Sequence, residues 1–158
     1  AYSRVNETAG KPLENANLDA VLASALLNLE FTLEEASAVV TQDPLPTLFC
    51  DDVQIGQVFQ NLIGNAIKYR SAEAPAIHIS SVRRGEEWII SVRDNGIGID
   101  PKYHERIFGI FKRLHGRELP GTGMGLAICR RIVERHKGRI WVESEAGRGA
   151  VFHFAVPA

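Results

Sequence analysis

The sequence predicts an α/β domain built around one largely antiparallel sheet. Three helical segments and several alternating strand segments follow one another in mixed order, which favours a helical layer packed on a sheet. The chain has 158 residues, of which 45% are hydrophobic and 23% charged. A chain of this length buries roughly 70% of the surface that its unfolded form exposes, which suffices for one domain without disulfides or metal.

The first third of the chain predicts a polar tail, a helix and two short strands. Residues 1–17 are polar and turn-rich. Residues 18–29 place leucine, valine and alanine at helical spacing. Residues 38–41 and 47–50 are short runs of β-type residues on either side of a proline-rich turn.

The strongest helix signal follows Asp51. Either Asp51 or Asp52 can cap this helix, and Gln54 stands in the capping-box position relative to Asp51. Apolar residues then recur at helical spacing, at Ile55, Val58, Phe59, Leu62, Ile63 and Ala66. Residues 77–84 and 88–94 alternate on either side of a short turn, which indicates a hairpin.

The last third combines a long polar segment with a helix and two strands. Residues 100–120 are mostly polar and contain one apolar group. Residues 124–137 predict a third helix, which Gly138 is placed to end. Residues 139–143 and 150–156 alternate as strands around a glycine-rich turn.

Composition and charge exclude several classes of function. Lys and Arg total 18 against 19 Asp and Glu, and a net charge of -1 provides no field to attract nucleic acid or an acidic membrane. The longest weakly polar run, residues 20–29, is far shorter than the ~20 residues that span a bilayer. Cys50 and Cys129 are isolated in apolar surroundings, which predicts buried free thiols and a reducing cytoplasm. We therefore expect no nucleic-acid partner and no direct membrane contact.

A polar stripe on the helix after Asp51 consists of Asn61, Asn65 and Lys68. At about 100° per residue, these side chains share the face opposite the apolar stripe. An amide oxygen suits Mg²⁺, which takes one or two protein ligands beside substrate phosphates, and a lysine amine pairs with phosphate. The alternative is an ordinary solvated helix face, which the helix alone favours.

A second group, Asp94-Asn95-Gly96-Ile97-Gly98-Ile99, follows the hairpin. Strand alternation places Asp94 on the apolar face, so a carboxylate points toward the core at a strand end and needs hydrogen-bond donors. The glycines leave room for a flat ligand, and the exocyclic amine of adenine is a suitable donor. Asn-Gly also marks two-residue hairpins, but the glycine and proline that follow interrupt the second strand that a hairpin needs.

A third motif, Gly121-Thr122-Gly123-Met124-Gly125-Leu126, opens the helix predicted over residues 124–137. Glycines let backbone N–H groups face a ligand, and a helix N-terminus adds unpaired donors and partial positive charge, so the motif predicts an anion site. No strand precedes it and its spacing is not that of the dinucleotide fingerprint, and the P-loop pattern is absent from the chain.

The segment between these two motifs predicts a lid or binding loop, because about 20 residues without regular structure are uncommon inside a compact domain. Phe108 and Phe111 fit two interpretations, a small satellite core or a latch that docks the lid on a neighbouring surface. Lys112, Arg113 and Arg117 either contact phosphate or keep the loop soluble.

Taken in order, these features resemble the ATP-binding domain of sensor histidine kinases, within the superfamily of gyrase, Hsp90, histidine kinase and MutL ATPases. The matching segments are residues 57–69 for the N box, 94–99 for the first glycine box, 107–114 for the F box and 121–126 for the second glycine box. Residues 111–117 are most similar to kinases attached to phytochrome-like or PAS sensors. The resemblance implies the Bergerat ATP-binding fold, a two-layer sandwich with a mixed, mostly antiparallel sheet and helices on one face.

The resemblance also implies residue roles, with ATP and Mg²⁺ as cofactors. Asn65 would ligate Mg²⁺, Asp94 would accept the adenine amine, and Lys68 with Arg113 would contact phosphate. The implied catalytic set is Asn61, Asn65 and Lys68. The implied nucleotide-binding set is Asn61, Asn65, Lys68, Tyr69, Asp94, Gly96, Ile97, Gly98, Arg113, Gly121, Thr122, Gly123, Met124, Gly125 and Leu126.

Asn61 bears on which branch of the superfamily the chain resembles. In the ATP-hydrolysing relatives the matching position is usually a glutamate that activates water, and an amide lacks the basicity for that task. Two alternatives remain at this point: a free-standing serine kinase of the anti-sigma type, and a non-catalytic nucleotide-binding adaptor.

The phosphoryl acceptor that the resemblance implies is missing from this chain. Sensor histidine kinases phosphorylate a histidine on a separate two-helix dimerisation domain, and none of the five histidines here lies beside an acidic residue on a long amphipathic helix. Residues 1–5 resemble the tail of that dimerisation helix. We therefore expect residues 1–17 to be its tail and a linker, and residues 18–158 to be the catalytic domain. The domain is expected to be cytoplasmic, and the whole protein is expected to be a homodimer, soluble or membrane-anchored, that acts on a response regulator indirectly.

Overall fold

The computed structural model describes residues 10–104, 106–108, 122–144 and 147–158. The strands are β1 (Glu14–Asn17), β2 (Val39–Gln42), β3 (Thr47–Cys50), β4 (Ala76–Arg84), β5 (Glu87–Asp94), β6 (Arg139–Ser144) and β7 (Ala150–Pro157). The helices are α2 (Leu18–Asn28), α3 (Glu30–Glu35), α4 (Asp52–Lys68) and α5 (Thr122–Arg135), with 3₁₀ turns η1 (Pro101–Tyr103) and η2 (Arg106–Phe108).

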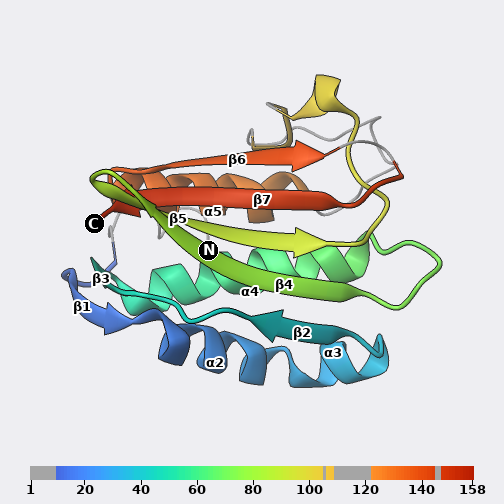
Figure 1. Cartoon of the computed structure of the whole chain (residues 1–158), viewed down its shortest axis with the longest axis horizontal. Helices are drawn as coiled ribbons and strands as arrows, with labels where there is room; N and C mark the ends of the chain where they lie inside the picture. Colours follow the sequence, from blue (N-terminus) through green and yellow to red (C-terminus); the bar gives the residue numbers. More distant parts are fainter. Residues whose placement is uncertain (1–9, 105, 109–121, 145–146) are drawn as a thin grey trace.

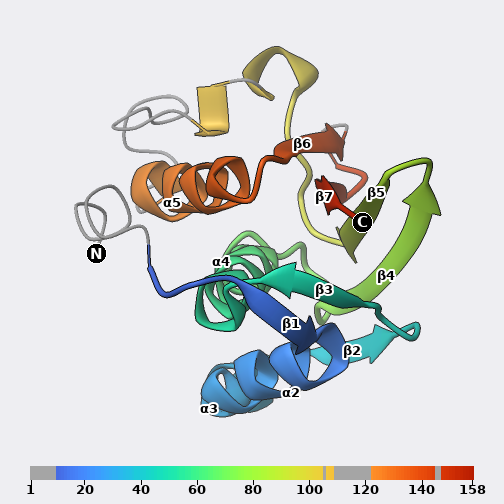
Figure 2. The same ribbon diagram turned by 90° about the vertical axis from the view of Figure 1, so that its left-hand side faces the viewer.

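The predicted two-layer α/β arrangement is confirmed. Five strands form a sheet in the order β2-β4-β5-β7-β6, in which β2 and β4 pair in parallel and the other neighbours are antiparallel (Figure 1). Helices α2, α4 and α5 lie on one side of this sheet (Figure 2). Strands of a sheet that is packed on one face alternate apolar and polar residues. The β4–β5 hairpin could therefore be predicted from the sequence.

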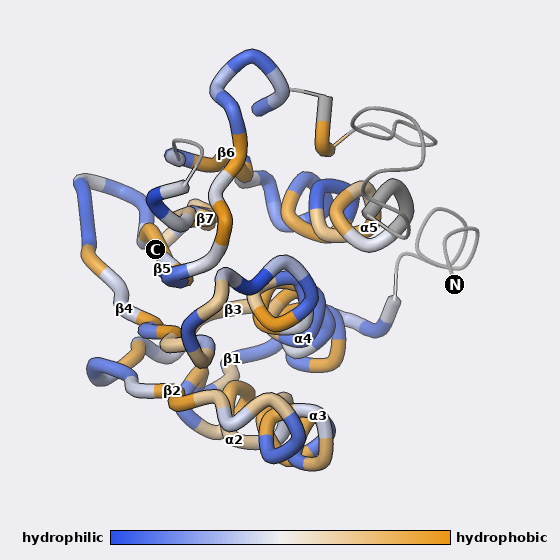
Figure 3. The backbone as a smooth tube through the Cα atoms, turned by 90° about the vertical axis from the view of Figure 1, so that its right-hand side faces the viewer, coloured by the Kyte–Doolittle hydropathy of each residue, from blue (hydrophilic) through white to orange (hydrophobic). Residues whose placement is uncertain are grey.

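Helix α4 begins at the predicted cap. The Asp51 carboxylate accepts the N–H groups of Val53 at 3.0 Å and Gln54 at 3.2 Å, which satisfies donors that the first turn leaves unpaired. Apolar and hydrophilic residues lie on different sides of α4 and α5, as expected for amphipathic helices (Figure 3).

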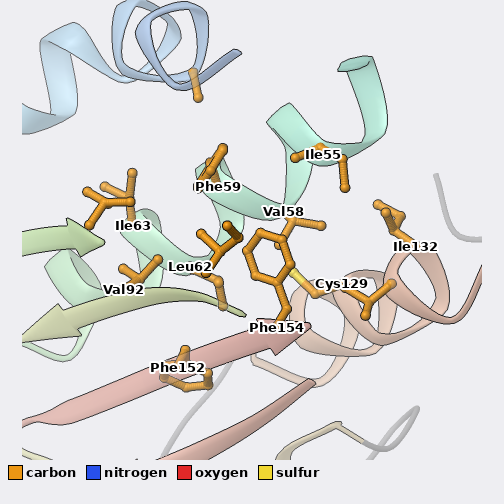
Figure 4. Close-up of a cluster of buried hydrophobic side chains, with 14 of the residues drawn as sticks. Ile55, Val58, Phe59, Leu62, Ile63, Val92, Cys129, Ile132, Phe152 and Phe154 are labelled. Carbon is orange, nitrogen blue, oxygen red and sulfur yellow. The ribbon is translucent and has the colours of Figure 1, made fainter. Parts of the chain in front are cut away.

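The apolar stripe of α4 forms the centre of the core. Its buried side chains contact those of β5, β7 and α5 (Figure 4). The Phe59 ring meets that of Phe154 edge to face, with centroids 5.9 Å apart. Burying an aromatic or branched aliphatic side chain contributes roughly 1.5–3 kcal/mol, so this stripe fixes α4 against the sheet.

A buried polar cluster joins the N-terminal segment to the start of α4 and the end of α5. The Arg135 guanidinium donates to Asp51 at 3.0 Å, to Gln54 at 2.8 Å and to the carbonyl of Lys11 at 2.6 Å. His136 Nε2 accepts the Asp51 N–H at 3.0 Å, and burial lowers the pKa of this imidazole, which is therefore neutral at pH 7. The segment before β1 is thus attached to the domain at the cap of α4.

The structure corrects the predicted organisation of the first third. Residues 14–17, which were assigned to the linker, form β1 and pair with β3 in a separate two-stranded sheet. Residues 47–50 therefore form a strand as predicted, but outside the main sheet. Helix α3 was not predicted, because no buried apolar stripe marks it. Residues 1–9, the predicted end of an upstream helix, lie outside the described residues.

The end of α5 differs in detail from its prediction. Lys137, at φ 64°, adopts the left-handed conformation after the helix, and Gly138 follows it. A Cβ on Gly138 would overlap the carbonyl oxygen of Ala155. Gly138 is therefore required by the close approach of the chain to β7, and the helix itself ends at Arg135.

The structure decides between the two interpretations of Phe108. Phe108 is 6% exposed, and its ring meets that of Phe152 edge to face at 6.1 Å. It therefore belongs to the core, next to the buried Ile107. Phe111, Lys112 and Arg117 lie outside the described residues.

Both cysteines are buried and free, as predicted. Burial raises the pKa of Cys50 to about 11 and that of Cys129 to about 12, so neither thiol ionises at neutral pH. Among the helices of the described ranges, none is both long and apolar enough to cross a membrane.

Candidate functional site

A mostly apolar cavity lies where the C-terminal end of α4, the end of β5 and the start of α5 meet. It is lined by Asn65, Ala66, Tyr69, Asp94, Ile97, Gly98, Ile99, Ile107, Leu126, Ala150 and Phe152. Small-molecule sites typically combine such apolar walls with a few convergent polar groups. Of the predicted nucleotide-binding residues, this lining brings together Asn65, Tyr69, Asp94, Ile97, Gly98 and Leu126.

Asp94 is the acidic residue of the lining. It ends β5, where it pairs with Ile77 on one side and Ala150 on the other, and its strand neighbours on the same face are buried. Burial raises the pKa of this carboxyl above its ordinary value, against backbone hydrogen bonds from Gly96 and Ala150 that lower it. The Gly96 N–H reaches Asp94 Oδ1 at 2.8 Å. A half-buried carboxylate with few donors is suited to accept a hydrogen bond from a ligand.

Asn65 reaches the cavity from the last turns of α4. Its side chain is half-buried, and within the described residues its amide makes no hydrogen bond to another group of the protein. The Asn65 carbonyl accepts the N–H of Tyr69, and the Tyr69 carbonyl accepts that of Ile97 at 3.1 Å. The end of α4 therefore anchors the loop that forms the cavity wall.

Gly96 is required by the close approach of this loop to α4. A Cβ at Gly96 would lie 2.7 Å from the carbonyl oxygen of Tyr69 and 3.0 Å from Asp94 Oδ1. Any side chain there would push the loop off the helix and displace the carboxylate. Gly98, at φ 77°, adopts the left-handed conformation that glycine tolerates best.

Asn61 and Lys68 do not line the cavity. The Asn61 amide donates to the carbonyl of Gly125 at 3.2 Å and so joins α4 to the first turns of α5. Lys68 is exposed, with Nζ 5.9 Å from the centroid of the Tyr69 ring. The helical stripe that they share with Asn65 extends beyond the cavity. The contacts of Asn61 and Lys68 with nucleotide therefore stay predictions.

The second glycine box is described in part. Residues 122–126 form the first turns of α5, two residues earlier than the helix was predicted to begin, and Leu126 lines the cavity. Gly121 and Arg113 lie outside the described residues, as do the side chains of Thr122 and Met124. The proposed anion site at this helix N-terminus therefore stays a prediction.

Five residues of the lining were not assigned to the nucleotide site from the sequence, namely Ala66, Ile99, Ile107, Ala150 and Phe152. The first three lie in the apolar stripe, the first glycine box and the F box, and signals for the other two were also present. Ala150 and Phe152 alternate inward along the last strand, and Ala150 is the strand partner of Asp94. Their place in the cavity depends on strand pairing, which the sequence alone did not specify.

The family follows from comparison with known proteins. Residues 50–158 match the family described as histidine kinase-, DNA gyrase B- and HSP90-like ATPase. The chain belongs to this family. Within the family it is a histidine kinase catalytic domain, because its relatives and structural neighbours include histidine kinases and the catalytic domain of one.

Among curated proteins, the chain is 54% identical over 158 residues to cyanobacterial phytochrome A of Nostoc sp., covering 99% of this chain and 20% of that protein. The chain thus spans about a fifth of the length of this phytochrome. The predicted likeness to phytochrome-type kinases is confirmed, and the comparisons favour a histidine kinase domain over the anti-sigma-type and adaptor alternatives.

Solved structures show the same fold in histidine kinases. The nucleotide-free catalytic domain of the histidine kinase ThkA superposes with a TM-score of 0.79 at 28% identity, covering 93% of this chain and 96% of that one. Full-length ShkA in complex with AMPPNP gives a TM-score of 0.83 at 27% identity, covering 99% of this chain and 33% of that one. ThkA has also been solved in complex with the response regulator protein TrrA.

Proposed function

We propose that this domain binds Mg-ATP in the cavity and donates the γ-phosphoryl group to a histidine on a separate dimerisation domain. The observation that carries this proposal is the position of Asp94, a half-buried carboxylate with a raised pKa in an apolar cavity, with Asn65 in the same lining. A flat apolar base with one exocyclic amine fits such walls and such an acceptor. The proposal also draws on the family of the chain.

The residues of the site divide into base recognition and metal binding. Asp94 accepts the adenine amine, while Ile97, Ile99 and Leu126 exclude water from the base. Asn65 fits a magnesium ligand, because the residue lines the cavity and its amide makes no hydrogen bond within the described residues. Bound Mg²⁺ would neutralise charge on the phosphates.

The chain's own residues contribute position more than acid–base chemistry. Phosphoryl transfer depends mainly on alignment and on electrostatic stabilisation of the transferred group. Asn61 carries an amide, which cannot take a proton from water. The domain is therefore suited to hold ATP until an acceptor histidine is brought in line with the γ-phosphate.

The proposed partners follow the same reasoning. A separate dimerisation domain supplies the acceptor histidine, this domain is cytoplasmic within a soluble or membrane-anchored homodimer, and a response regulator receives the phosphoryl group from that histidine. The complex of ThkA with its response regulator supports a regulator as the final partner of a related kinase. The near-neutral net charge of -1 favours neither nucleic acid nor an anionic membrane as a partner.

Calorimetric titration of the chain with ATP and with GTP, each with and without Mg²⁺, tests the binding step. We expect saturable binding of one ATP, tighter with Mg²⁺ than without it, and much weaker binding of GTP. Guanine presents a carbonyl where adenine has its amine, so GTP would place two acceptors against each other at Asp94. Equal affinity for ATP and GTP would contradict the role of Asp94.

A further inference from the structure

Ser144, the last residue of β6, connects one wall of the cavity to the turn between β6 and β7. Its Oγ accepts the N–H of Ile99 at 2.7 Å and donates to the carbonyl of Gly149 at 2.7 Å. Ser144 does not line the cavity itself. A serine hydroxyl has one proton to donate and lone pairs that accept. Here the proton is donated to Gly149, and a lone pair accepts the Ile99 N–H.

The wall in question is the strip Ile97-Gly98-Ile99, all of which lines the cavity. Its first residue is held by the backbone, since the Ile97 N–H donates to Tyr69 and the Ile97 carbonyl accepts the N–H of Gly147. Its last residue is held by side chains, because the Ile99 N–H donates to Ser144 and the Ile99 carbonyl lies 3.1 Å from His104 Nε2. The Ser144 hydroxyl is thus the described partner of the Ile99 N–H.

The same turn also touches Asp94. Gly149 has a φ of 76°, and a Cβ there would overlap the carbonyl oxygen of Asp94. Ser144 therefore fixes Ile99 to a turn whose backbone lies directly against the residue that ends β5. The hydroxyl thus links the apolar wall, through Gly149, to the backbone at Asp94.

We infer that Ser144 is a positioning residue for adenine recognition, an inference that rests on the proposed binding of ATP. Without the hydroxyl, the Ile99 N–H loses its partner and the wall populates other conformations in the free domain. Apparent affinity falls in proportion to the fraction of molecules that hold the competent conformation. Because the wall faces the base, adenosine and Mg-ATP lose affinity by the same factor.

Calorimetric titration of wild type, Ser144→Ala and Ser144→Thr with adenosine and with Mg-ATP tests this inference. We expect Ser144→Ala to weaken both ligands roughly three- to tenfold, the range for one hydrogen bond, and Ser144→Thr to retain affinity because it keeps the hydroxyl. The matched control is Ser91→Ala, which removes a hydroxyl bonded to His153 at 2.7 Å on the opposite face of the sheet. Ser91→Ala should bind both ligands as wild type does.

Unchanged adenosine affinity in Ser144→Ala would overturn the inference alone, as would equal losses in the alanine and threonine variants. Failure of the wild-type chain to bind either ligand would overturn the proposed function as well. Amide hydrogen exchange in the free protein gives a readout that needs no ligand. The Ile99 amide should exchange faster in Ser144→Ala than in wild type, and equal exchange at a retained unfolding temperature would contradict the role of the hydroxyl.

Discussion

Asn65→Ala is expected to abolish Mg²⁺-dependent ATP binding while the domain stays folded. The amide lines the cavity but makes no hydrogen bond within the described residues, so its loss leaves no buried group unsatisfied. Alanine is also the stronger helix former, by up to about 0.7 kcal/mol. We therefore expect the unfolding temperature to stay the same or rise slightly. Calorimetric titration with ATP and Mg²⁺ measures the loss.

Two comparisons make the Asn65 experiment specific. Gln57 lies about two turns earlier on α4 and outside the cavity lining, so Gln57→Ala should bind Mg-ATP as wild type does. Adenosine carries no phosphate and needs no metal, so Asn65→Ala should keep its adenosine affinity. If Asn65→Ala bound Mg-ATP with unchanged affinity, the proposed metal role of this residue would be wrong.

Asp94→Ala is expected to weaken ATP binding roughly 10- to 150-fold, which corresponds to about 1.5–3 kcal/mol for a hydrogen bond to a charged group. Preference for ATP over GTP should fall at the same time, because the acceptor that distinguishes the two bases is gone. Competition of the two nucleotides for the wild-type and variant domains measures both effects. A variant that kept the full preference for ATP would rule out Asp94 as the residue that recognises the base.

Asp94→Asn separates the binding role of this residue from its effect on stability. Because burial raises the pKa of Asp94 in the folded state, the folded protein binds this proton more tightly than the unfolded chain does. The contribution of Asp94 to stability is therefore fully present below the ordinary pKa of aspartate and is lost as the pH rises through the folded-state pKa.

Asparagine stays neutral at every pH, so the free Asp94→Asn domain should be more stable than wild type at pH 7. This advantage should shrink as the pH falls through the folded-state pKa of Asp94. Thermal unfolding between pH 7 and pH 4 measures the difference. A variant that was less stable than wild type at pH 7 would show that the charge stabilises the free domain.

Local patterns in the sequence predicted most of the main sheet and the cavity. The apolar stripe of α4 and the β4–β5 hairpin are set by spacing within a few residues, and both appear as predicted. Strand alternation also placed Asp94 correctly on the face that carries Ile90 and Val92.

Features that depend on contacts between residues distant in the sequence were not predicted. Strand β1 has the polar sequence ENAN, and it is a strand because it pairs with β3, 30 to 36 residues away. The helical stripe grouped Asn61 with Asn65. In the structure the Asn61 amide bonds to α5, whereas Asn65 lines the cavity. The contact of Ser144 with Ile99 spans 45 residues and is likewise invisible in a local pattern.

The most direct test of the account is incubation of the purified chain with γ-labelled ATP and Mg²⁺, alone and with a separate dimerisation domain that carries the acceptor histidine. Because we propose that the acceptor lies on a separate domain and because Asn61 cannot activate water, we expect no acid-labile label on the five histidines and negligible phosphate release from the chain alone. Label should then appear on the added domain. Acid-labile label on the chain's own histidines, or rapid release of phosphate without the added domain, would contradict the account and indicate an autonomous enzyme.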